Sequence, residues 1–407
     1  MKFGLLGEKL AHSYSPEIHA QFGDYQYDLF EVAPNDLKAF FASTTWTGIN
    51  VTIPYKQAVI AFCDELSPAA RGIGSVNTII RRADGTLYGD NTDAYGFAYL
   101  IKNVVVKNKK ILVLGSGGSC RTVRHVLLQQ EAGEVVVVSR VGEHNYGNLE
   151  RHYDAEIIIN TTPVGMYPDN GNSPLSLQYF NKVETVVDLI YNPTKTMLLL
   201  EAEQLGITAI SGLPMLVAQA AMASEIFTGR PVATECINKI VNQIHRKTQN
   251  IILIGMPGCG KTTVATELAR ISGRKMIDTD DKIEQLADES IVEMFARGEQ
   301  YFRDYEAFVI KEFGAEAGLI IATGGGCIKT PDNYDNLRQN GVMFWLERSV
   351  TDLSRDGRPL SVGDLELMYQ ERKPLYDHFS DKVVVNDQPV EAVAQQVWRC
   401  FNENFDC

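Results

Sequence analysis

Short apolar runs alternate with longer amphipathic segments along the first part of the chain. Residues 2–6, 27–32 and 48–53 are apolar and rich in β-forming side chains, whereas residues 35–41 and 56–66 have apolar positions three and four apart. The first pattern predicts buried strands and the second predicts helices. Strands that alternate with helices assemble into mostly parallel sheets, so this part of the chain is expected to be an α/β structure.

The alternation continues after one interruption. Residues 78–88 carry an Asp-Gly pair between two β-rich runs, which predicts a hairpin. Residues 110–114 and 134–138 are strongly apolar runs. Between them lie a glycine-rich turn and a helix that runs to about residue 129, which is half of a dinucleotide-binding unit.

The residues that follow these two strands bear on the nucleotide. The turn at 115–118 is Gly-Ser-Gly-Gly, and the general G-x-G-x-x-G pattern would need a glycine at Cys120, so this signal alone is weak. Ser139 and Arg140 stand where an acidic residue would bind a free ribose 2′-hydroxyl. A hydroxyl and a guanidinium suit a 2′-phosphate, which favours NADP(H) over NAD, although Glu143 nearby weakens the preference.

A second nucleotide motif begins beyond residue 250. Residues 255–262 fit G-x-x-x-x-G-K-T, between an apolar run at 250–254 and a predicted helix at 263–270. Glycines let backbone N–H groups point at phosphate oxygens, and the helix N-terminus adds positive potential. Lys261 would reach the outer phosphates and Thr262 would hold Mg²⁺. Since such a loop normally opens its own domain, a separate unit must precede it.

Composition narrows the class of protein. The 407 residues suggest two or three domains, and 45% hydrophobic and 22% charged residues are ordinary for globular cores. A net charge of −13 argues against nucleic acid or an anionic membrane as partner, and no apolar run is long enough to span a bilayer. The seven scattered cysteines suit reduced thiols in a cytosol. We therefore expect a cytoplasmic protein with small-molecule substrates, and the sequence leaves its oligomeric state open.

Polar residues interrupt the apolar pattern of the first unit. Taken singly, each has an ordinary explanation, such as Ser15 and Asp93 as helix caps or Gln219 as a hydrogen-bonded core residue. Taken in order, they resemble shikimate dehydrogenase over about residues 1–245. The matching motifs are Ser-x-Ser-Pro (13–16), Asn-Val-Thr-Ile-Pro-x-Lys (50–56), Val-Asn-Thr (76–78), Asn-Thr-Asp (91–93), Gly-x-Gly-Gly (115–118), Asn-Thr-Thr (160–162), Tyr-Asn-Pro-Thr-Lys-Thr (191–196) and Gly-Leu-Pro-Met-Leu-Val-Ala-Gln (212–219).

The resemblance implies NADPH-dependent reduction of 3-dehydroshikimate to shikimate, with Lys56 and Asp93 as the catalytic pair. An ammonium beside the ring ketone would stabilise the negative charge that develops on oxygen and could supply the proton. Val141 departs from the family, which usually has threonine there, and this bears on cofactor preference. The resemblance also implies substrate contacts from Ser13, Ser15, Thr52, Asn77, Tyr191 and Gln219, and NADP contacts from Gly115, Ser116, Gly117, Gly118, Ser139, Arg140, Gly212 and Met215.

The second unit has its own ordered set of motifs. Asp278 and Asp280 lie two apart in a predicted strand at 276–280, which would put both on one side of that strand. With the phosphate-binding loop, residues 249–407 resemble shikimate kinase, which implies Mg-ATP-dependent phosphorylation of shikimate at its 3-hydroxyl. The other motifs are Gly-Glu-x-x-Phe-Arg (298–303), Gly-Gly-Gly (324–326), Arg-Pro-Leu (358–360) and Arg-x-Pro-Leu-Tyr (372–376).

Residue roles in this unit also follow from the resemblance. Asp280 would meet the acceptor hydroxyl and accept its proton, and guanidinium groups would bind the substrate carboxylate bidentately. Ser361, where the family usually has leucine, leaves the lid in question. The implied sets are Gly258, Cys259, Gly260, Lys261, Thr262, Thr263, Arg355 and Arg358 for ATP, Thr262 and Asp278 for the metal, and Asp280, Arg303, Gly324, Gly325, Gly326 and Arg372 for the substrate.

The whole sequence is therefore interpreted as a bifunctional enzyme of aromatic amino acid (chorismate) biosynthesis. We expect a substrate-binding domain at 1–100 completed by about 216–247, a Rossmann-like NADP-binding domain at 101–215, and a P-loop kinase domain with a parallel sheet at 249–407. The joint at 244–250 is too short for a long flexible tether. The alternatives are an NAD-linked quinate/shikimate dehydrogenase fused to the kinase, a regulatory protein with one inactive half, and a generic P-loop ATPase.

Overall fold

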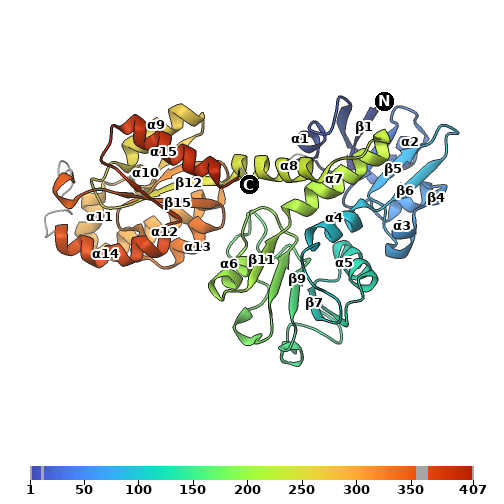
Figure 1. The fold of residues 1–407 in the computed structure, drawn as a ribbon, viewed down its shortest axis with the longest axis horizontal. Helices are drawn as coiled ribbons and strands as arrows, with labels where there is room; N and C mark the ends of the chain where they lie inside the picture. Colours follow the sequence, from blue (N-terminus) through green and yellow to red (C-terminus); the bar gives the residue numbers. More distant parts are fainter. Residues whose placement is uncertain (1, 11–12, 354–364, 406–407) are drawn as a thin grey trace. The chain divides into compact units, whose positions relative to one another are not determined.

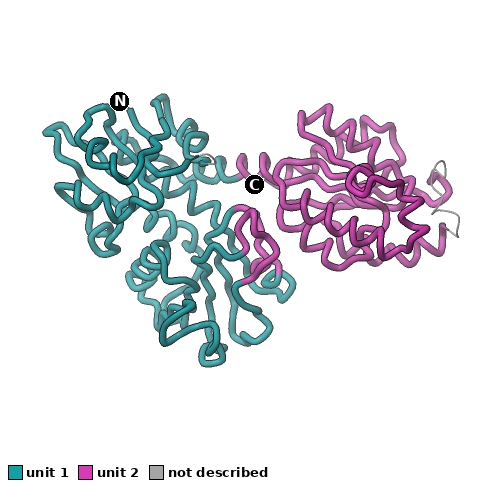
Figure 2. The backbone as a smooth tube through the Cα atoms, turned by 180° about the vertical axis from the view of Figure 1, so that it is seen from behind, with its two compact units in different colours: residues 1–164, 174–191, 201–241 teal, residues 165–173, 192–200, 242–407 magenta. Residues whose placement is uncertain are grey.

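The computed structural model describes residues 2–10, 13–353 and 365–405. Contacts divide the chain into two compact units (Figure 2). Unit 1 comprises residues 1–164, 174–191 and 201–241, and unit 2 comprises residues 165–173, 192–200 and 242–407. Residues 165–173 and 192–200 belong to unit 2, whereas the sequence-based prediction places them in the NADP-binding domain at 101–215. The limits of the three predicted domains stay a prediction.

Unit 1 contains a first sheet in which parallel and antiparallel strand pairs are mixed. The strand order is β2-β1-β3-β5-β6-β4. β1 pairs in parallel with β2 and β3, and the predicted hairpin is confirmed as the antiparallel pair β5–β6 (Figure 1). The strands are β1 (Lys2–Gly7), β2 (Gln26–Glu31), β3 (Gly48–Val51), β4 (Glu65–Leu66), β5 (Thr78–Arg81) and β6 (Leu87–Asp90), with helices α1 (Ser15–His19), α2 (Leu37–Ala42) and α3 (Pro68–Ile73).

The helix predicted at residues 56–66 is wrong. The chain forms a short 3₁₀ turn at Ala58–Phe62 and then the strand β4. Glu65 and Leu66 pair with Tyr88 and Gly89 of β6. Their backbone groups therefore bond within the sheet and not within a helix. Tertiary pairing therefore overrides the local helical spacing.

The second sheet of unit 1 is parallel throughout. Its order is β11-β10-β9-β7-β8, so chain order reverses beside β7. In such sheets ligands bind at the carboxyl ends of the strands where the order reverses. Both strands predicted here, and the helix between them, are confirmed. The elements are β7 (Lys110–Leu114), α5 (Gly118–Gln129), β8 (Glu134–Val138), β9 (Ile157–Asn160), β10 (Thr185–Asp188), α6 (Met197–Gln204) and β11 (Thr208–Ser211).

Two helices, α4 (Thr92–Leu100) and α7 (Leu213–Thr228), pack closely within unit 1. A Cβ atom at Gly96 of α4 would lie 2.6 Å from the carbonyl oxygen of Met215 and 2.9 Å from the Cβ of Gln219. The lack of a side chain at this glycine therefore allows the two backbones to approach. The approach matters for function because α4 carries Asp93 and α7 carries Met215 and Gln219.

Unit 2 is built on a third sheet, also parallel, in the order β13-β14-β12-β15-β16. Helices α9 and α15 cover one face, and α12, α13 and α14 cover the other (Figure 1). The strands are β12 (Asn250–Ile254), β13 (Met276–Asp278), β14 (Ile320–Ala322), β15 (Gly341–Glu347) and β16 (Lys382–Val385). The helices are α9 (Lys261–Ser272), α10 (Thr279–Ala287), α11 (Ile291–Arg297), α12 (Glu299–Ala315), α13 (Asp332–Arg338), α14 (Leu365–Phe379) and α15 (Val390–Glu403).

The predicted joint at 244–250 is not a separate linker. Helix α8 (Thr234–Thr248) runs through most of it, and β12 begins at Asn250. Arg274 donates hydrogen bonds to the carbonyl oxygens of Arg246 and Gln249, which satisfies acceptors at the carboxyl end of α8. The guanidinium of Arg274 also lies 4.8 Å from the centre of the Phe401 ring. The last turn of α8 is thereby part of the second unit.

The cysteines and the apolar helices of the described residues can be compared with the sequence-based expectations. The six described cysteines are all unpaired, and Cys407 lies outside the described residues. No helix in the described ranges is long and apolar enough to cross a membrane.

The close approach at Gly96 predicts a stability effect. Gly96→Ala should lower the free energy of unfolding of unit 1 by about 1–2 kcal/mol, because the new methyl group meets a backbone carbonyl that cannot rotate away. Calorimetric unfolding measures this change. Gly147→Ala is the control, since its Cβ would meet only the amide oxygen of Asn145 at 3.1 Å. Equal stability of the Gly96 variant and the parent would contradict the packing argument.

Candidate functional sites

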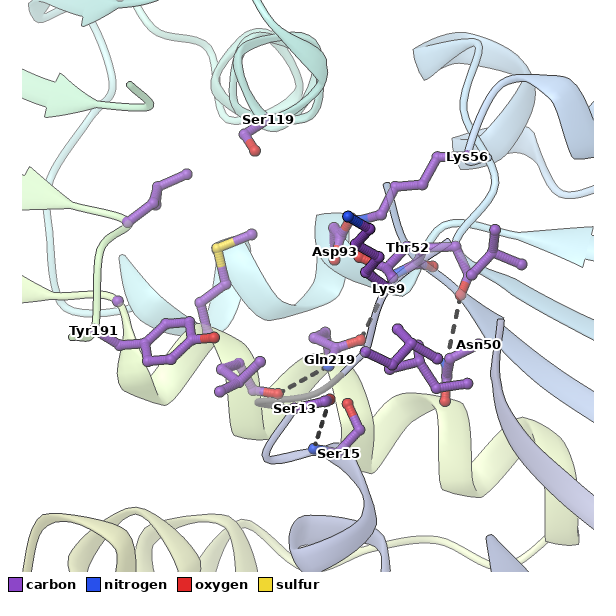
Figure 3. Close-up of a pocket in the computed structure, with 18 residues that line it drawn as sticks. Lys9, Ser13, Ser15, Asn50, Thr52, Lys56, Asp93, Ser119, Tyr191 and Gln219 are labelled. Carbon is purple, nitrogen blue, oxygen red and sulfur yellow. Dashed lines mark hydrogen bonds and ion pairs between the residues drawn. The ribbon is translucent and has the colours of Figure 1, made fainter. Parts of the chain in front are cut away.

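Unit 1 contains a cleft of about 600 Å³ between its two sheets (Figure 3). The cleft brings together residues from β3, α4, α7 and the loops after β1 and β10. Every dehydrogenase substrate and catalytic residue predicted from the sequence lines it, and so do two predicted cofactor residues. Those residues are Ser13, Ser15, Thr52, Lys56, Asn77, Asp93, Tyr191, Gly212, Met215 and Gln219.

Lys56 and Asp93 form an ion pair inside this cleft. Lys56 Nζ lies 2.6 Å from Asp93 Oδ2, and the two side chains are 30% and 19% exposed. Asp93 is in the first turn of α4 and does not cap it, because Asn91 is the N-cap and accepts from the N–H of Ala94. The carboxylate therefore fixes an ammonium group at the cleft surface, where it can donate to an oxygen of a bound ligand.

A chain of hydrogen bonds orients the amide side chains of the cleft. Asn77 Nδ2 donates to Thr92 Oγ1 at 3.1 Å, and Asn77 Oδ1 accepts from the N–H of Thr92 at 2.7 Å. Gln219 Nε2 donates to the carbonyl oxygen of Leu216 at 3.0 Å, which leaves Gln219 Oε1 facing Asn77 Nδ2 at 3.5 Å. Because these partners fix which end of each amide is donor and which is acceptor, the cleft presents a defined pattern to hydroxyl groups.

Hydroxyl groups gather at the end of the cleft formed by α1. Ser13 Oγ accepts from the N–H of Ser15 at 3.2 Å. Ser15 is the first residue of α1, so its predicted role as the helix cap is wrong; Tyr14 holds the cap position, and its side chain makes no capping hydrogen bond. The ring of Tyr14 meets the ring of Tyr191 edge to face, with centroids 6.1 Å apart. Burial raises the pKa of Tyr191, so its phenol is a hydrogen-bond donor at neutral pH.

The cleft has further polar residues that were not assigned from the sequence. Lys9 and Ser119 line it, and so does Asn50, whose Oδ1 accepts from Tyr27 Oη at 2.7 Å. The sequence predicts Asn50 to lie in reach of the same crevice as Thr52 and Lys56, but it gives this residue no role. Nothing in the local sequence around Lys9 indicated a site, whereas Ser119 directly follows the glycine-rich turn at 115–118.

The residues predicted to bind the dinucleotide follow β7 and β8. Gly115 has φ of 100°, and a Cβ there would lie 2.9 Å from Thr161 Oγ1. A Cβ at Gly117 or Gly118 would meet no atom within 4 Å, so the turn before α5 has open space for a phosphate group. Cys120, in the place of the third glycine, is buried in the core.

At the end of β8, Arg140 is the predicted residue whose side chain is open to an anion. Arg140 is exposed, and the N–H of Ser139 is bonded to the carbonyl oxygen of His144. Ser139 Oγ donates to the carbonyl oxygen of Val141 at 2.5 Å, so this hydroxyl would have to exchange that bond to contact a 2′-phosphate. The glycines and these two residues therefore surround the carboxyl edge of the second sheet without lining the cleft itself.

Unit 2 contains its own cleft of about 570 Å³, beside the phosphate-binding loop. Cys259 and Thr263 do not line it: Cys259 is buried, and its carbonyl oxygen accepts from Asn386. Arg355 and Arg358 lie outside the described residues, as does Ser361. The other predicted residues all line the cleft, namely Gly258, Gly260, Lys261, Thr262, Asp278, Asp280, Arg303, Gly324, Gly325, Gly326 and Arg372.

The loop between β12 and α9 has the geometry of an anion cradle. Gly255, Gly258 and Gly260 all have positive φ, which turns successive backbone N–H groups inward. Lys261 is buried, and its ammonium donates to the carbonyl oxygens of Gly255 at 2.8 Å and Met256 at 3.0 Å. A phosphate in the cradle would therefore meet N–H groups, a lysine and the first turn of α9.

The two residues predicted to hold Mg²⁺ lie next to the cradle. Thr262 Oγ1 donates to Asp278 Oδ2 at 2.6 Å, and Asp278 Oδ1 accepts from the N–H of Asp280 at 3.0 Å. The predicted strand at 276–280 is too long: β13 ends at Asp278, which caps α10, and Asp280 lies in the first turn of that helix. Among the described residues, no group of three or more acidic, histidine or cysteine side chains could hold a metal ion.

A buried ion pair supports the opposite wall of this cleft. Arg303 Nη1 lies 2.7 Å from Glu306 Oε2, and Glu306 is fully buried. Burial raises the pKa of Glu306 to about 7. A Cβ at Gly326 would collide with the Arg303 guanidinium, and Arg372 Nη1 donates to the carbonyl oxygen of Gly325 at 3.0 Å. Gly326 therefore packs against Arg303, Gly325 accepts from Arg372, and a Cβ at Gly324 would meet the carboxylates of Asp280 and Glu306. The sequence indicated both arginines but not the buried Glu306.

Family models match both units. The shikimate dehydrogenase substrate binding domain matches residues 5–79, the shikimate 5′-dehydrogenase C-terminal domain matches residues 212–241, and shikimate kinase matches residues 257–402. A shikimate dehydrogenase (NADP(+)) from Clostridium perfringens is 38% identical over 250 residues, 56% of this chain and 92% of the relative. One from Geobacillus kaustophilus is 39% identical over 256 residues, 56% of this chain and 92% of the relative.

Solved structures are similar to the same part of the chain. A chorismate mutase/shikimate 5-dehydrogenase fusion protein from Clostridium acetobutylicum gives a TM-score of 0.57 at 38% identity, covering 60% of this chain and 96% of that one. Shikimate 5-dehydrogenase from Thermus thermophilus, solved with NADP(H) and shikimate, gives 0.54 at 32% identity, covering 60% of this chain and 99% of that one.

The buried pair in unit 2 predicts a pH effect on stability. The pKa of Glu306 is about 7 in the folded protein against an ordinary 4.5, so the folded state holds this proton more tightly than the unfolded state. Through this group, the free energy of unfolding therefore falls as pH rises from about 4.5 to 7. Relative to Glu306→Gln, the parent should lose up to about 3 kcal/mol of stability between pH 5 and 8.

Calorimetric unfolding of unit 2 across this pH range makes the measurement. Glu312→Gln, an exposed position on the same helix α12, is the control and should follow the parent at every pH. Parallel pH curves for the parent and the Glu306 variant would mean that the buried carboxyl titrates normally.

Proposed function

Because the chain belongs to the shikimate dehydrogenase family and carries a shikimate kinase domain at residues 257–402, we propose that its two clefts perform consecutive reactions. The first reduces 3-dehydroshikimate to shikimate with NADPH, and the second phosphorylates shikimate at its 3-hydroxyl with Mg-ATP. The observation that carries the proposal is the presence, in one chain, of a lysine–aspartate pair in a polar cleft and of an arginine-walled cleft beside a phosphate-binding loop.

The reduction centres on Lys56. NADPH supplies the hydride that reaches the ring ketone, and the ketone oxygen gains negative charge. The ammonium of Lys56 donates a hydrogen bond to that oxygen and then a proton, while Asp93 at 2.6 Å keeps the ammonium in place. In the reverse direction the same pair would take the proton from the hydroxyl.

The rest of the first cleft orients the substrate. Ser13 and Ser15 offer hydroxyl donors for the carboxylate, beside the first turn of α1. Asn77 and Gln219, with their fixed amides, bind ring hydroxyls, and Tyr191 donates from the other side of the cleft. Thr52 contributes a further hydroxyl beside Lys56, and Gly212 and Met215 lie where the nicotinamide would enter.

The cofactor site is assigned to the turn at 115–118 and to the end of β8. The open space at Gly117 and Gly118 receives the pyrophosphate, and Arg140 with Ser139 contacts the 2′-phosphate. An enzyme that prefers NAD and quinate is the competing assignment within the same chemistry. Turnover with NADPH and NADH, each on shikimate and on quinate, distinguishes the two.

Phosphoryl transfer depends on placement and charge. The loop N–H groups and Lys261 bind the nucleotide phosphates, while Thr262 and Asp278 hold Mg²⁺. Asp280 accepts the proton of the attacking hydroxyl. Arg303 and Arg372 bind the substrate carboxylate, and Gly324, Gly325 and Gly326 support the ring.

A coupled assay tests the proposed function as a whole. The purified chain is supplied with 3-dehydroshikimate, NADPH and Mg-ATP, and shikimate 3-phosphate is followed. Product should require both cofactors, and ATP consumption should require shikimate. ATP hydrolysis that is independent of shikimate would instead indicate a generic ATPase, and loss of one reaction alone would indicate an inactive half.

Lys56→Ala should lower kcat of the reduction by about 10²–10⁴-fold, because the developing oxyanion loses its donor and its proton source. Kinase activity should be unchanged, since Lys56 belongs to unit 1. Initial rates of NADPH oxidation and of shikimate phosphorylation provide both readings. Reduction at near the parent rate would remove Lys56 from the catalytic pair.

Lys261→Ala should have the reverse effect. Phosphorylation should fall by at least about 100-fold, because the outer phosphates lose their buried cation, and reduction should continue at the parent rate. The same two assays measure it. A variant that still phosphorylates shikimate at a rate similar to the parent would exclude the role given to this lysine.

A further inference from the structure

Arg303 in the cleft of unit 2 contacts two different carboxylates of the protein itself. Its Nη1 atom donates to the buried Glu306 at 2.7 Å. Its other edge donates to one oxygen of Glu299, from Nε at 3.3 Å and from Nη2 at 3.0 Å. Lys329 Nζ donates to that same oxygen of Glu299 at 2.5 Å. Two cations of the cleft therefore share a single carboxylate oxygen.

The two carboxylates differ in how freely they could leave. The Glu306 side chain is fully buried, whereas the Glu299 side chain is 49% exposed and lies at the first position of α12. Glu299 could rotate into solvent without leaving a buried charge, because it is already partly hydrated. Glu306 could not leave Arg303 in this way, because an ionised carboxylate that remains in the core without its partner lowers the free energy of unfolding. Only the Glu299 side of Arg303 is therefore exchangeable.

The contact with Glu299 is also weaker than the best contact available to a guanidinium. Nε and Nη2 both point at one oxygen, while the strongest arrangement pairs two N–H groups with two carboxylate oxygens. Glu299, Arg303 and Lys329 all line the cleft, so an incoming carboxylate would reach this edge directly. Hydrogen bonds from Lys329 and then Arg303 lower the pKa of Glu299, which keeps it ionised while it occupies the edge.

We propose that Glu299 is an internal stand-in for the substrate carboxylate, which displaces it from Arg303 and then also contacts the released Lys329. The proposal rests on the proposed function, in which Arg303 binds that carboxylate. It gives Glu299 a role in specificity: a ligand without a negative charge finds this edge of Arg303 occupied, and only a carboxylate can exchange with it. It also makes Lys329 a third cation of the acceptor site, beside Arg303 and Arg372.

Glu299→Gln tests the exchange. Kinase rates are measured on the full chain at saturating Mg-ATP without NADP(H), with shikimate varied. Removal of the internal competitor should lower KM for shikimate by about threefold, a size that fits a half-exposed ion pair. Benzoate, used as a simple ring carboxylate, should inhibit the variant at correspondingly lower concentration. A KM that rises or stays the same would overturn the proposal, because Glu299 would then position Arg303 or do nothing at the site.

Lys329 is tested separately. Lys329→Gln should raise KM for shikimate severalfold with kcat little changed, and Lys329→Arg should restore most of the affinity because it keeps the charge. An unchanged KM in Lys329→Gln would exclude the lysine from the acceptor site. A Lys329→Arg variant as impaired as Lys329→Gln would mean that the lysine acts through local structure and not through its charge.

Two controls separate the possible failures. Glu312→Gln removes a charge from an exposed position of the same helix, outside the cleft, and should leave KM unchanged. Arg303→Ala should raise KM strongly if Arg303 binds the substrate carboxylate. An unchanged KM in Arg303→Ala would refute the proposed function of this arginine, whereas a raised KM there together with no decrease in Glu299→Gln would refute only the stand-in.

Discussion

In the absence of ligand, a cationic side chain in a half-buried cleft needs a protein group that compensates its charge. Both clefts of the chain meet this requirement. Lys56 is held by Asp93 at 2.6 Å, and Lys261 by the carbonyl oxygens of Gly255 and Met256. Arg303 has one carboxylate in the core and another at the cleft surface. Removing a charge from water without a partner is costly, so each cation is placed by the group that neutralises it.

The type of partner suits the chemistry at each place. A carboxylate that stays with Lys56 positions it as a proton donor throughout the reduction. Carbonyl oxygens at Lys261 are weaker partners, which a phosphate can replace without leaving a buried charge. At Arg303 the permanent and the exchangeable partner are separated onto two edges of one guanidinium. The partner of Lys56 is therefore fixed and the partners of Lys261 are exchangeable. Arg303 has one partner of each kind.

Parallel sheets make these arrangements compact. The carboxyl ends of neighbouring parallel strands meet at one edge, so loops far apart in the sequence deliver side chains to one cleft. In unit 2 the loops after β12 and β14 supply the phosphate cradle and the three glycines, and the junction of β13 with α10 supplies the two aspartates. In unit 1 the helices α4 and α7 complete the cleft, and the approach at Gly96 fixes their separation. Helix α8 then leads directly into β12 of the second unit.

By itself the sequence determined the α/β class, most strands, both nucleotide-binding turns and many of the polar residues of the two clefts, because apolar period and motif order are local properties. Only the tertiary structure decided that residues 65–66 join a sheet, that Asp280 belongs to a helix and that the joint at 244–250 is mostly helical. Helical spacing in the sequence puts Glu299 and Glu306 near Arg303. Only their burial shows that Glu306 is the permanent partner and Glu299 the exchangeable one. Burial depends on neighbours from distant segments, which no local pattern contains.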